Sequence, residues 1–416
     1  MNQTFLELLA EIEDFRKGNA IHYRLQDILL VSALAVICNM DTYTEMAMFA
    51  DHQKKYLAPF CDFRHGTPSH DTFGKVLSRL DPRVLSERFS AWMSELYFHL
   101  GKLVESKGMT VAIDGKTICR SGSAEQNASH VLTAFASRMQ LVLGQIKTDE
   151  KSNEITAIPE LLELFQVKDT VVTIDAMGTQ KNIAAKIIEK GGDYVLAVKG
   201  NQKKLRDDII WHLHSELQDR STRELKAKGQ YAVTLEKDHG RIEKRECYLS
   251  NDLSWFEGLE DWRGIAGVGW IRNTRHVDNK NDKTTTEDHY FIYSLKEAQA
   301  KDLLRIKREH WAIENNLHWM LDMAFREDDC RARAKNAAEV MNILRKLALQ
   351  MLKTCDTCKC GMRSKRKLCG LGIPTALQVL GRCLRACLFR KRLPCAWRLF
   401  FCPKYSECGK IKRHVA

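Results

Sequence analysis

Two short segments of the chain each close an apolar run with an aspartate. The first, TVAIDG at residues 110–115, carries Asp114, and the second, VVTIDAMG at residues 171–178, carries Asp175. Both segments have the composition of buried β-strands, so each carboxylate is expected at a strand end. One such aspartate often only caps the next helix. Two of them at the carboxyl edge of a sheet with parallel strands indicate a site, because active sites form at that edge.

Two neighbouring carboxylates repel each other unless a cation neutralises them. Oxygen ligands alone select Mg²⁺ or Mn²⁺. A pair of such ions serves phosphodiester chemistry, in which one activates the attacking oxygen and the other stabilises the leaving oxygen. The pattern therefore predicts metal-dependent chemistry on a phosphodiester. A nucleotide-binding P-loop ending in Gly115-Lys116-Thr117 is excluded, because its first glycine would fall at Thr110.

A third carboxylate is expected from the segment REHWAIENNLHWMLDMAF at residues 308–325. Helical spacing puts His310, Glu314 and His318 on or near one face, together with apolar residues. Polar groups on such a face cost stability unless they serve a site, so Glu314 is the favoured acid. Four competing acids follow it, and the last three have the pattern of a solvated helix end: Asp322, Glu327, Asp328 and Asp329.

The elements that must position these residues predict an α/β fold. Strands are expected at 110–115, 129–137, 141–148, 169–178 and 193–201, with helices at 154–165 and 180–192. The order β-β-β-α-β-α-β implies a mixed sheet flanked by helices. The polar stretch 205–295 is interpreted as a β-rich insertion, and helices are expected at 298–325 and 336–352.

Three domains are predicted along the chain. Residues 1–107 form a helical N-terminal domain, 108–353 the catalytic domain with its insertion, and 354–416 a poorly ordered tail. Within the first, GTPSHDTFGKVLSRLDP at 66–82 predicts a short helix capped by Ser69 or Asp71. This helix fits the second helix of a helix-turn-helix or a plain packing element, and the sequence leaves both open.

The basic charge and the cysteines concentrate in the tail. The chain has a net charge of +12, and residues 354–416 contain 15 Lys and Arg against 2 Asp and Glu. The basic excess therefore lies in this tail. A cationic tail on a near-neutral body indicates a polyanion such as DNA, or only a solubilising end. Nine of the 14 cysteines lie between Cys355 and Cys408, which favours thiols or metal ligands over disulfides. Cys355 and Cys358 could form half of a zinc site, but no second pair follows at a suitable spacing.

No signal peptide and no membrane span are predicted. The N-terminal segment MNQTFLELLAEIEDF has no basic region ahead of an apolar core. The longest apolar run, at residues 28–38, is too short to cross a bilayer. We therefore expect a cytoplasmic protein, nucleoid-associated when bound to DNA, without a membrane partner.

The chain resembles insertion-sequence transposases of the H-repeat-associated type, in the class that uses an Asp-Asp-Glu triad on an RNase H-like core. Matching segments cover about residues 10 to 350 and include VAIDGKT, TIDAMGTQKNIAAKIIEKGGDYVLAVKGNQ, HGRIEKRE and HWAIENNLHWMLDMAF. The resemblance implies cutting and joining of DNA with Mg²⁺ or Mn²⁺. It carries the triad onto Asp114, Asp175 and Glu314, which the strand and helix patterns also favour. Its implied partners are terminal inverted repeats and target DNA, bound as a homodimer.

Further DNA contacts follow from the same resemblance. Gly115 would let the backbone and DNA approach closely, and Lys116 would meet a phosphate. The other expected DNA contacts are Lys199, Asn201, Gln202, His239, Arg241, Arg308, His310 and His318. Related transposases carry an Arg four residues before the triad Glu and a Lys seven after it. Here His310 and Leu321 hold those places, so Arg308 or His318 is expected to compensate.

The sequence as a whole is interpreted as a DNA transposase, with three alternatives left open. A hydrolytic nuclease on the same core would cut DNA without joining it. A transposase relic would bind DNA without chemistry. A zinc-bearing interaction protein would depend on the Cys-rich tail. The resemblance fades after about Lys367, where the composition suggests an altered reading frame or a degenerate end.

Overall fold

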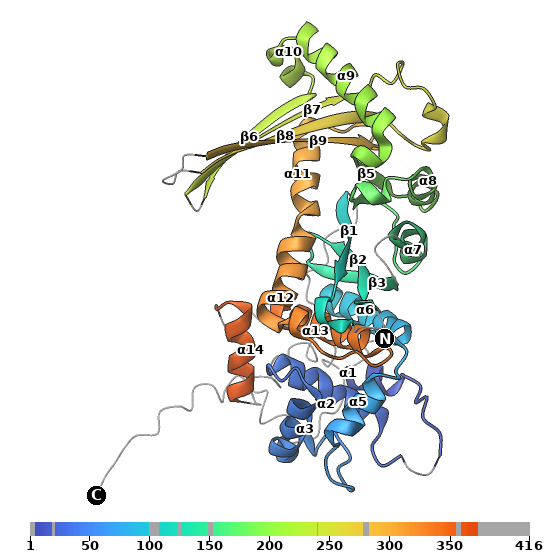
Figure 1. Cartoon of the computed structure of the whole chain (residues 1–416), viewed down its shortest axis with the longest axis vertical. Helices are drawn as coiled ribbons and strands as arrows, with labels where there is room; N and C mark the ends of the chain where they lie inside the picture. The colour runs from blue at the N-terminus through green and yellow to red at the C-terminus, as the bar shows by residue number, and fades with distance from the viewer. Residues whose placement is uncertain are drawn as a thin grey trace, which may run out of the picture. The chain divides into compact units, whose positions relative to one another are not determined.

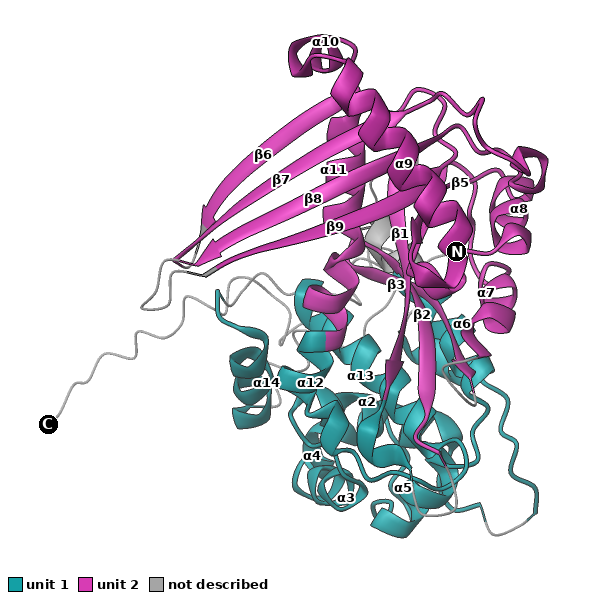
Figure 2. Cartoon of the chain, turned by 45° about the horizontal axis from the view of Figure 1, so that its top comes forward, with its two compact units in different colours: residues 1–103, 118–126, 319–416 teal, residues 104–117, 127–318 magenta. Residues whose placement is uncertain are grey.

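The computed structural model describes residues 5–18, 21–99, 108–122, 127–148, 153–238, 240–277, 283–354 and 359–372. The chain forms two compact units, coloured separately in Figure 2. The helical unit comprises residues 1–103, 118–126 and 319–416, and the sheet unit comprises residues 104–117 and 127–318. The units interleave along the chain, whereas the predicted domains follow one another in sequence.

One nine-stranded sheet forms the sheet unit, in the order β3-β2-β1-β4-β5-β9-β8-β7-β6 (Figure 1). The strands are β1 (Met109–Thr117), β2 (His130–Ala136), β3 (Leu141–Thr148), β4 (Thr170–Ile174), β5 (Asp193–Val198), β6 (Tyr231–Asp238), β7 (Arg241–Ser250), β8 (Gly267–Val277) and β9 (Lys283–Tyr293). Strands β1 to β3 pair antiparallel, whereas β1, β4 and β5 pair parallel. This order and these directions are those of an RNase H-like core, and the predicted fold class is confirmed.

Three of the five described helices that flank this sheet lie where the apolar patterns predict them, whereas those at residues 203–219 and 222–227 fall largely in the stretch predicted to be β-rich. The five are α7 (Glu154–Leu161), α8 (Lys181–Glu189), α9 (Lys203–Asp219), α10 (Thr222–Ala227) and α11 (Ala300–His310). Strand β4 is buried along its whole length, as expected for a parallel strand covered on both faces. The amphipathic α11 buries Leu303, Leu304 and Ile306 in a core cluster that also holds Ile271 and Phe291 of the sheet.

The predicted insertion at 205–295 is joined to the core by backbone hydrogen bonds. It begins with α9 and α10 and continues as the four antiparallel strands β6 to β9. The last of these, β9, pairs antiparallel with β5 of the core, from Val195 opposite Tyr293 to Val198 opposite Tyr290. The insertion therefore extends the core sheet instead of forming a separate one.

The helical unit contains the N-terminal helices together with the last helices of the described chain. They are α1 (Phe5–Ala10), α2 (Leu25–Ile37), α3 (Tyr43–His52), α4 (Lys54–Leu57), α5 (His70–Leu77), α6 (Pro82–His99), α12 (Trp319–Phe325), α13 (Ala337–Thr354) and α14 (Met362–Leu371). Helix α13 packs against α2 and α6 and is buried on nearly every face. This burial explains why it belongs to the helical unit and not to the catalytic domain predicted for it. The cap of α5 is Ser69, whose Oγ accepts a hydrogen bond from the amide of Thr72.

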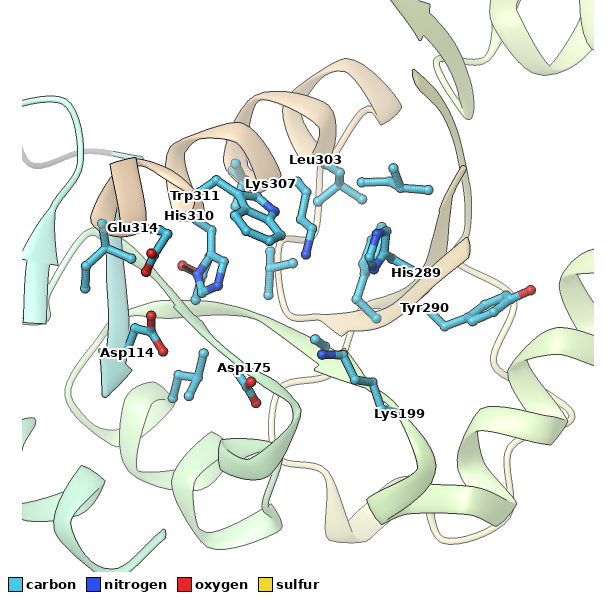
Figure 3. A pocket seen from close by; sticks show the side chains of 18 residues that line it. Asp114, Asp175, Lys199, His289, Tyr290, Leu303, Lys307, His310, Trp311 and Glu314 are labelled. Atoms are coloured by element: carbon cyan, nitrogen blue, oxygen red, sulfur yellow. Dashed lines mark hydrogen bonds between the residues drawn. The ribbon is translucent and has the colours of Figure 1, made fainter. Parts of the chain in front are cut away.

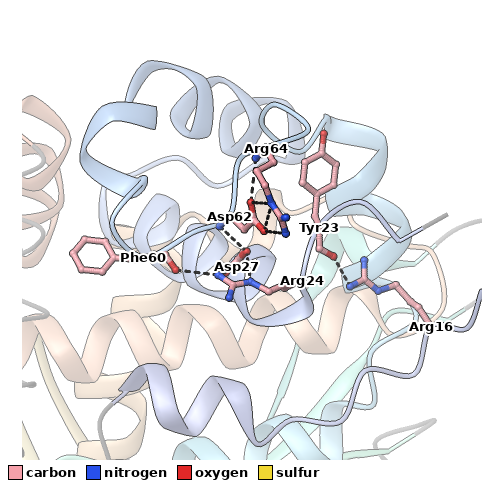
Figure 4. Close-up of polar contacts among 7 residues, drawn as sticks. All are labelled: Arg16, Tyr23, Arg24, Asp27, Phe60, Asp62 and Arg64. Atoms are coloured by element: carbon pink, nitrogen blue, oxygen red, sulfur yellow. Dashed lines mark hydrogen bonds and ion pairs between the residues drawn. The ribbon is translucent and has the colours of Figure 1, made fainter. Parts of the chain in front are cut away.

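A buried carboxylate organises the start of the helical unit (Figure 4). Asp27 is 2% exposed and accepts hydrogen bonds from the guanidinium of Arg24 at 2.8 and 2.9 Å. It also accepts one from the backbone amide of Asp62 at 3.0 Å, which ties the segment after α4 to α2. Asp62 in turn is bound by the side chain of Arg64. The polar groups in this apolar region are thus paired, as burial requires.

Part of the predicted tail has a defined place in the helical unit. Arg366 of α14 is fully buried, donates to the carbonyl of Val36 at 2.7 Å and to Asp41 at 2.6 Å, and lies 4.0 Å over the ring of Phe325. The structure thus differs from the predicted poorly ordered tail at residues 359–372, because this charge is paired and packed. The zinc half-site at Cys355 and Cys358 and residues 373–416 lie outside the described residues. Among the described helices, none combines the length and apolar composition that a bilayer crossing needs.

Candidate metal and DNA site

The parallel pairing of β1 and β4 sets Asp114 and Asp175 at the same level of the sheet. The last registered pair of this ladder is Ile113 opposite Ile174, and each strand continues with its aspartate. Both side chains line a cavity of about 330 Å³ (Figure 3). The sheet edge therefore presents two carboxylates side by side, where carboxyl ends of parallel strands meet.

Local hydrogen bonds orient both aspartates. The amide of Gly115 donates to Asp114 Oδ1 at 2.9 Å, and the amide of Met177 donates to Asp175 Oδ1 at 2.8 Å. The second bond caps a short 3₁₀ turn at Ala176–Gly178. Each carboxylate thus keeps its other oxygen available for a ligand in the cavity.

A π-helical turn, Glu314–His318, brings a third carboxylate and an imidazole to Asp114. His318 Nδ1 lies 3.1 Å from Glu314 Oε2 and 3.6 Å from Asp114 Oδ2. One ligand atom from each of the three lies within 4.8 Å of the others, and we call this set the metal trio. Single π turns interrupt α-helices mostly at functional sites, because they move side chains away from ordinary helical register.

The electrostatics of the metal trio favour a cation. Burial raises the pKa of Asp114, and the charges of Asp175 and Glu154 raise it further, although His318 opposes them. The hydrogen bond from His318 lowers the pKa of Glu314, and the charge of Lys116 adds to this effect. A positive charge between Asp114 and Glu314 would therefore stabilise both carboxylates in their ionised form.

The donor set of the metal trio fits a divalent ion. Two carboxylates and one imidazole converge, and among the described residues no lysine or arginine forms an ion pair with Asp114, Asp175 or Glu314. Carboxylate oxygens suit Mg²⁺ and Mn²⁺, and an imidazole nitrogen suits Mn²⁺ better than Mg²⁺. Asp175 lines the same cavity but lies outside the trio.

Two family models match the chain over most of its length. A model described as DDE_Tnp_1-associated matches residues 6–93, and one described as Transposase DDE domain matches residues 105–351. The chain belongs to the DDE transposase family. The predicted resemblance to H-repeat-associated transposases is confirmed by the relatives that follow.

Curated relatives match almost the whole transposase chain. It is 36% identical over 386 residues to "Putative transposase YncI" of Escherichia coli O157:H7, which covers 92% of this chain and 95% of the relative. It is also 36% identical to "H repeat-associated putative transposase YhhI" of Escherichia coli K12, over 87% of this chain and 93% of the relative. Among solved structures, a piggyBac transposase synaptic complex with hairpin DNA matches at 10% identity and TM-score 0.40, over 98% of this chain and 81% of that one.

Gly115 of the transposase is required by packing beneath the site. A Cβ atom there would lie 2.3 Å from both His130 Nε2 and Glu154 Oε1. These two side chains form a buried pair at 2.6 Å, and Thr117 shares a 2.8 Å hydrogen bond with His130 Nδ1. Packing is thus one reason for the glycine, and the close approach of DNA stays a prediction.

Two predicted DNA contacts instead hold the loop that carries Asp175. The side-chain amide of Asn201 donates to the carbonyl of Ala176, and that of Gln202 donates to the carbonyl of Thr179 at 3.1 Å. These bonds connect the end of β5 with the end of β4. The contact of either residue with DNA stays a prediction.

His310 is a neutral group in the wall of the cavity. It shares a 2.9 Å hydrogen bond with the hydroxyl of Thr173. Burial lowers the pKa of His310 to about 3, and the charges of Lys307 and Lys199 contribute. A neutral imidazole can donate one hydrogen bond, but it cannot replace the charge of the arginine that related transposases carry at this place.

Two lysines from different elements give the cavity positive charge. Lys199 follows β5, and Lys307 projects from α11 toward the same space (Figure 3). Burial, together with the nearby charge of Lys199, lowers the pKa of Lys307 to about 8. Lys307 was missed in the sequence, although it lies seven residues before Glu314 and hence two helical turns away.

The remaining predicted DNA contacts lie on the inserted strands and α11. Arg241 pairs with Glu243 at 3.0 Å, and Arg308, 55% exposed, pairs with Glu236 of β6. His239 lies outside the described residues. Glu309, the other acid near His310, is bound by Thr110, Arg138 and Arg305, so it holds α11 to the sheet and is not open to a metal.

Proposed function

We propose that this transposase cuts and joins insertion-sequence ends at Asp114, Asp175 and Glu314 with Mg²⁺ or Mn²⁺. The observation that supports this most is the β1–β4 register, which sets both aspartates at one level beside the Glu314 turn. When bound there, divalent ions would activate the attacking oxygen and stabilise the leaving oxygen. Water would attack the phosphorus at the element end, and the released 3′-OH would then attack target DNA.

The chain's own residues contribute positioning and charge. Asp114, Glu314 and His318 would hold one ion, and Asp175 would face the same space from β4. Lys199 and Lys307, which line the same cavity, would attract the phosphate. In the first step the oxygen of water replaces one phosphodiester oxygen, and in the second the 3′-OH oxygen replaces another. Neither ATP nor a covalent enzyme intermediate is therefore needed.

Terminal inverted repeats and target DNA are the proposed partners, with a homodimer on DNA and a cytoplasmic location. Recognition of the ends is assigned to the helical unit and to the inserted strands. Helix α5 presents His70, Asp71 and Lys75 opposite its buried Phe73 and Leu77, which leaves one face open for a groove of DNA.

The test is cleavage and strand transfer on a labelled element end with Mg²⁺, comparing the intact chain with Asp175→Asn. Joined product that disappears in the variant supports the transposase. Cut but unjoined product supports the alternative of a hydrolytic nuclease on the same core. Binding without cutting by both proteins contradicts the proposal and indicates a DNA-binding relic.

A further inference from the structure

A second groove continues from the metal cavity along the inserted strands. It has a volume of about 580 Å³ and lies between α11 and strands β7 to β9. Four residues line both spaces: Ile271, His289, Lys307 and Trp311. A polymer that occupies the groove can therefore reach the carboxylates without leaving the sheet unit.

The charge of this groove suits a polyanion. Six lysines and arginines line it, against the two acids Glu243 and Glu287. Three of these cations, Arg241, Arg245 and Arg275, pair with the single carboxylate of Glu243. Arg245 also pairs with Glu236, which Arg308 shares, so two carboxylates face four guanidinium groups and the cluster keeps a net positive charge for phosphates.

An aromatic side chain stands where the groove meets the metal cavity. Trp311 is 50% exposed, although a tryptophan of its size normally buries most of its surface. The ammonium of Lys307 lies 5.7 Å from the centre of its ring. An exposed indole beside a cation is a stacking platform for a nucleobase, with phosphate contacts close by.

We propose that this groove binds single-stranded DNA and that Trp311 stacks on an unpaired base next to the scissile phosphate. Inside a duplex each base face is covered by its neighbour, so an indole can stack on a base only where the strand is unpaired. The inference rests on the proposed function only for the origin of this strand, which would be the element end.

Binding is measured by fluorescence anisotropy with a short labelled single-stranded oligonucleotide and with the matching duplex, in EDTA. Trp311→Ala is expected to weaken single-strand binding about tenfold, since one stacked base contributes roughly 1–3 kcal/mol. Trp311→Phe should keep most of the affinity. Trp211→Ala is the matched control, because Trp211 is 71% exposed on α9 and does not line the groove.

The charge arm uses Arg275→Ala, with Arg223→Ala on α10 as the control outside the groove. Loss of one phosphate contact should reduce the slope of log affinity against log salt by about 0.7 for a single strand. The proposal is overturned if Trp311→Ala binds the single strand as the control does, or if it weakens duplex binding equally. The binding assay contains EDTA and therefore does not depend on a metal. A chain that fails to cut DNA with Mg²⁺ but keeps Trp311-dependent binding in EDTA would contradict the proposed function and leave this inference standing.

Discussion

Two clusters in the sheet unit bring metal-type side chains equally close, yet they differ in what those side chains already bind. Beside the metal trio there is a second set, the α9 trio of His212, Glu216 and Asp252, whose ligand atoms also lie within 4.8 Å of one another. Both contain two carboxylates and a histidine. Residue type and spacing therefore do not separate them.

The α9 trio is saturated by protein partners. Glu216 accepts from the hydroxyl of Tyr248 at 2.8 Å and pairs with Arg220 at 3.0 Å. Asp252 accepts from the backbone amide and the hydroxyl of Ser254. In the metal trio, by contrast, the acids are bound, among the described residues, by His318 and one backbone amide. A metal site is indicated by acceptors that remain unused, since buried acceptors already bonded gain little from an ion.

The most direct test of the difference between the two trios is to remove one carboxylate at a time. Asp114→Asn, Asp175→Asn and Glu314→Gln should each lower DNA cleavage by roughly a hundredfold to a thousandfold or more, because transition-state charge loses its electrostatic support. Asp114→Asn should also abolish tight Mn²⁺ binding, read by electron paramagnetic resonance. The matched control His212→Asn should bind Mn²⁺ as the parent does. Equal losses in both variants would show that the clusters do not differ.

A methyl group at Gly115 tests the support beneath the metal trio. Gly115→Ala should lower the free energy of unfolding by about 1–3 kcal/mol, because the Cβ would overlap the His130–Glu154 pair. Mn²⁺ affinity should fall as well, since the Gly115 amide orients Asp114. Gly200→Ala is the control, because a Cβ there meets nothing within 4 Å. His130→Ala should cost less stability in the alanine background than in the parent; additive costs would contradict the packing explanation.

An isosteric change that removes one negative charge tests the α9 trio. Glu216→Gln should lower the free energy of unfolding by about 1.5–3 kcal/mol, because Tyr248 and Arg220 lose a charged acceptor. Urea denaturation measures this loss. Mn²⁺ affinity should stay at the parent value, and a stoichiometric loss of bound metal would reassign the α9 trio to metal binding.

Lys307 gives the smallest expected effect, and the size of this effect depends on pH. Its pKa in the folded chain is about 8, below the ordinary lysine value, so the unfolded chain binds more protons between those two values. Stability contributed by this group therefore rises as pH increases through that window. Lys307→Met should raise Tm below pH 8 by about 2 °C, since the group is half-buried. The gain should vanish by about pH 10.5. A pH-independent gain would contradict the assigned cause.

The acids of the site could be predicted because their signals are local. An apolar run that ends in Asp114 or Asp175 identifies a strand end, and the βββαβαβ order identifies a sheet that can bring two such ends together. Glu314 followed from the helical face that it shares with apolar residues. These arguments need only neighbours in sequence.

The surroundings of the site depend on contacts between distant residues. Helical spacing placed His318 on the face of Glu314, but its position 3.6 Å from Asp114 of β1 depends on the π turn and on the sheet, which the spacing does not describe. Its contact with DNA stays a prediction. The role of Gly115 depends on His130 and Glu154, which come from another strand and a helix. Lys307 had a signal in its spacing from Glu314, but a lysine on a helix more often faces solvent.

The ladder between β5 and β9 has a consequence for how this family member can be trimmed. Strand β5 follows directly on the parallel core and is covered on its outer side by β9 alone. Deleting residues 205–295 would therefore leave the unpaired amides and carbonyls of β5 as a sheet edge. Such an edge pairs readily with other chains and leads to aggregation. The inserted strands are thus a protective cover as well as the proposed binding surface, and shortening them requires a replacement edge.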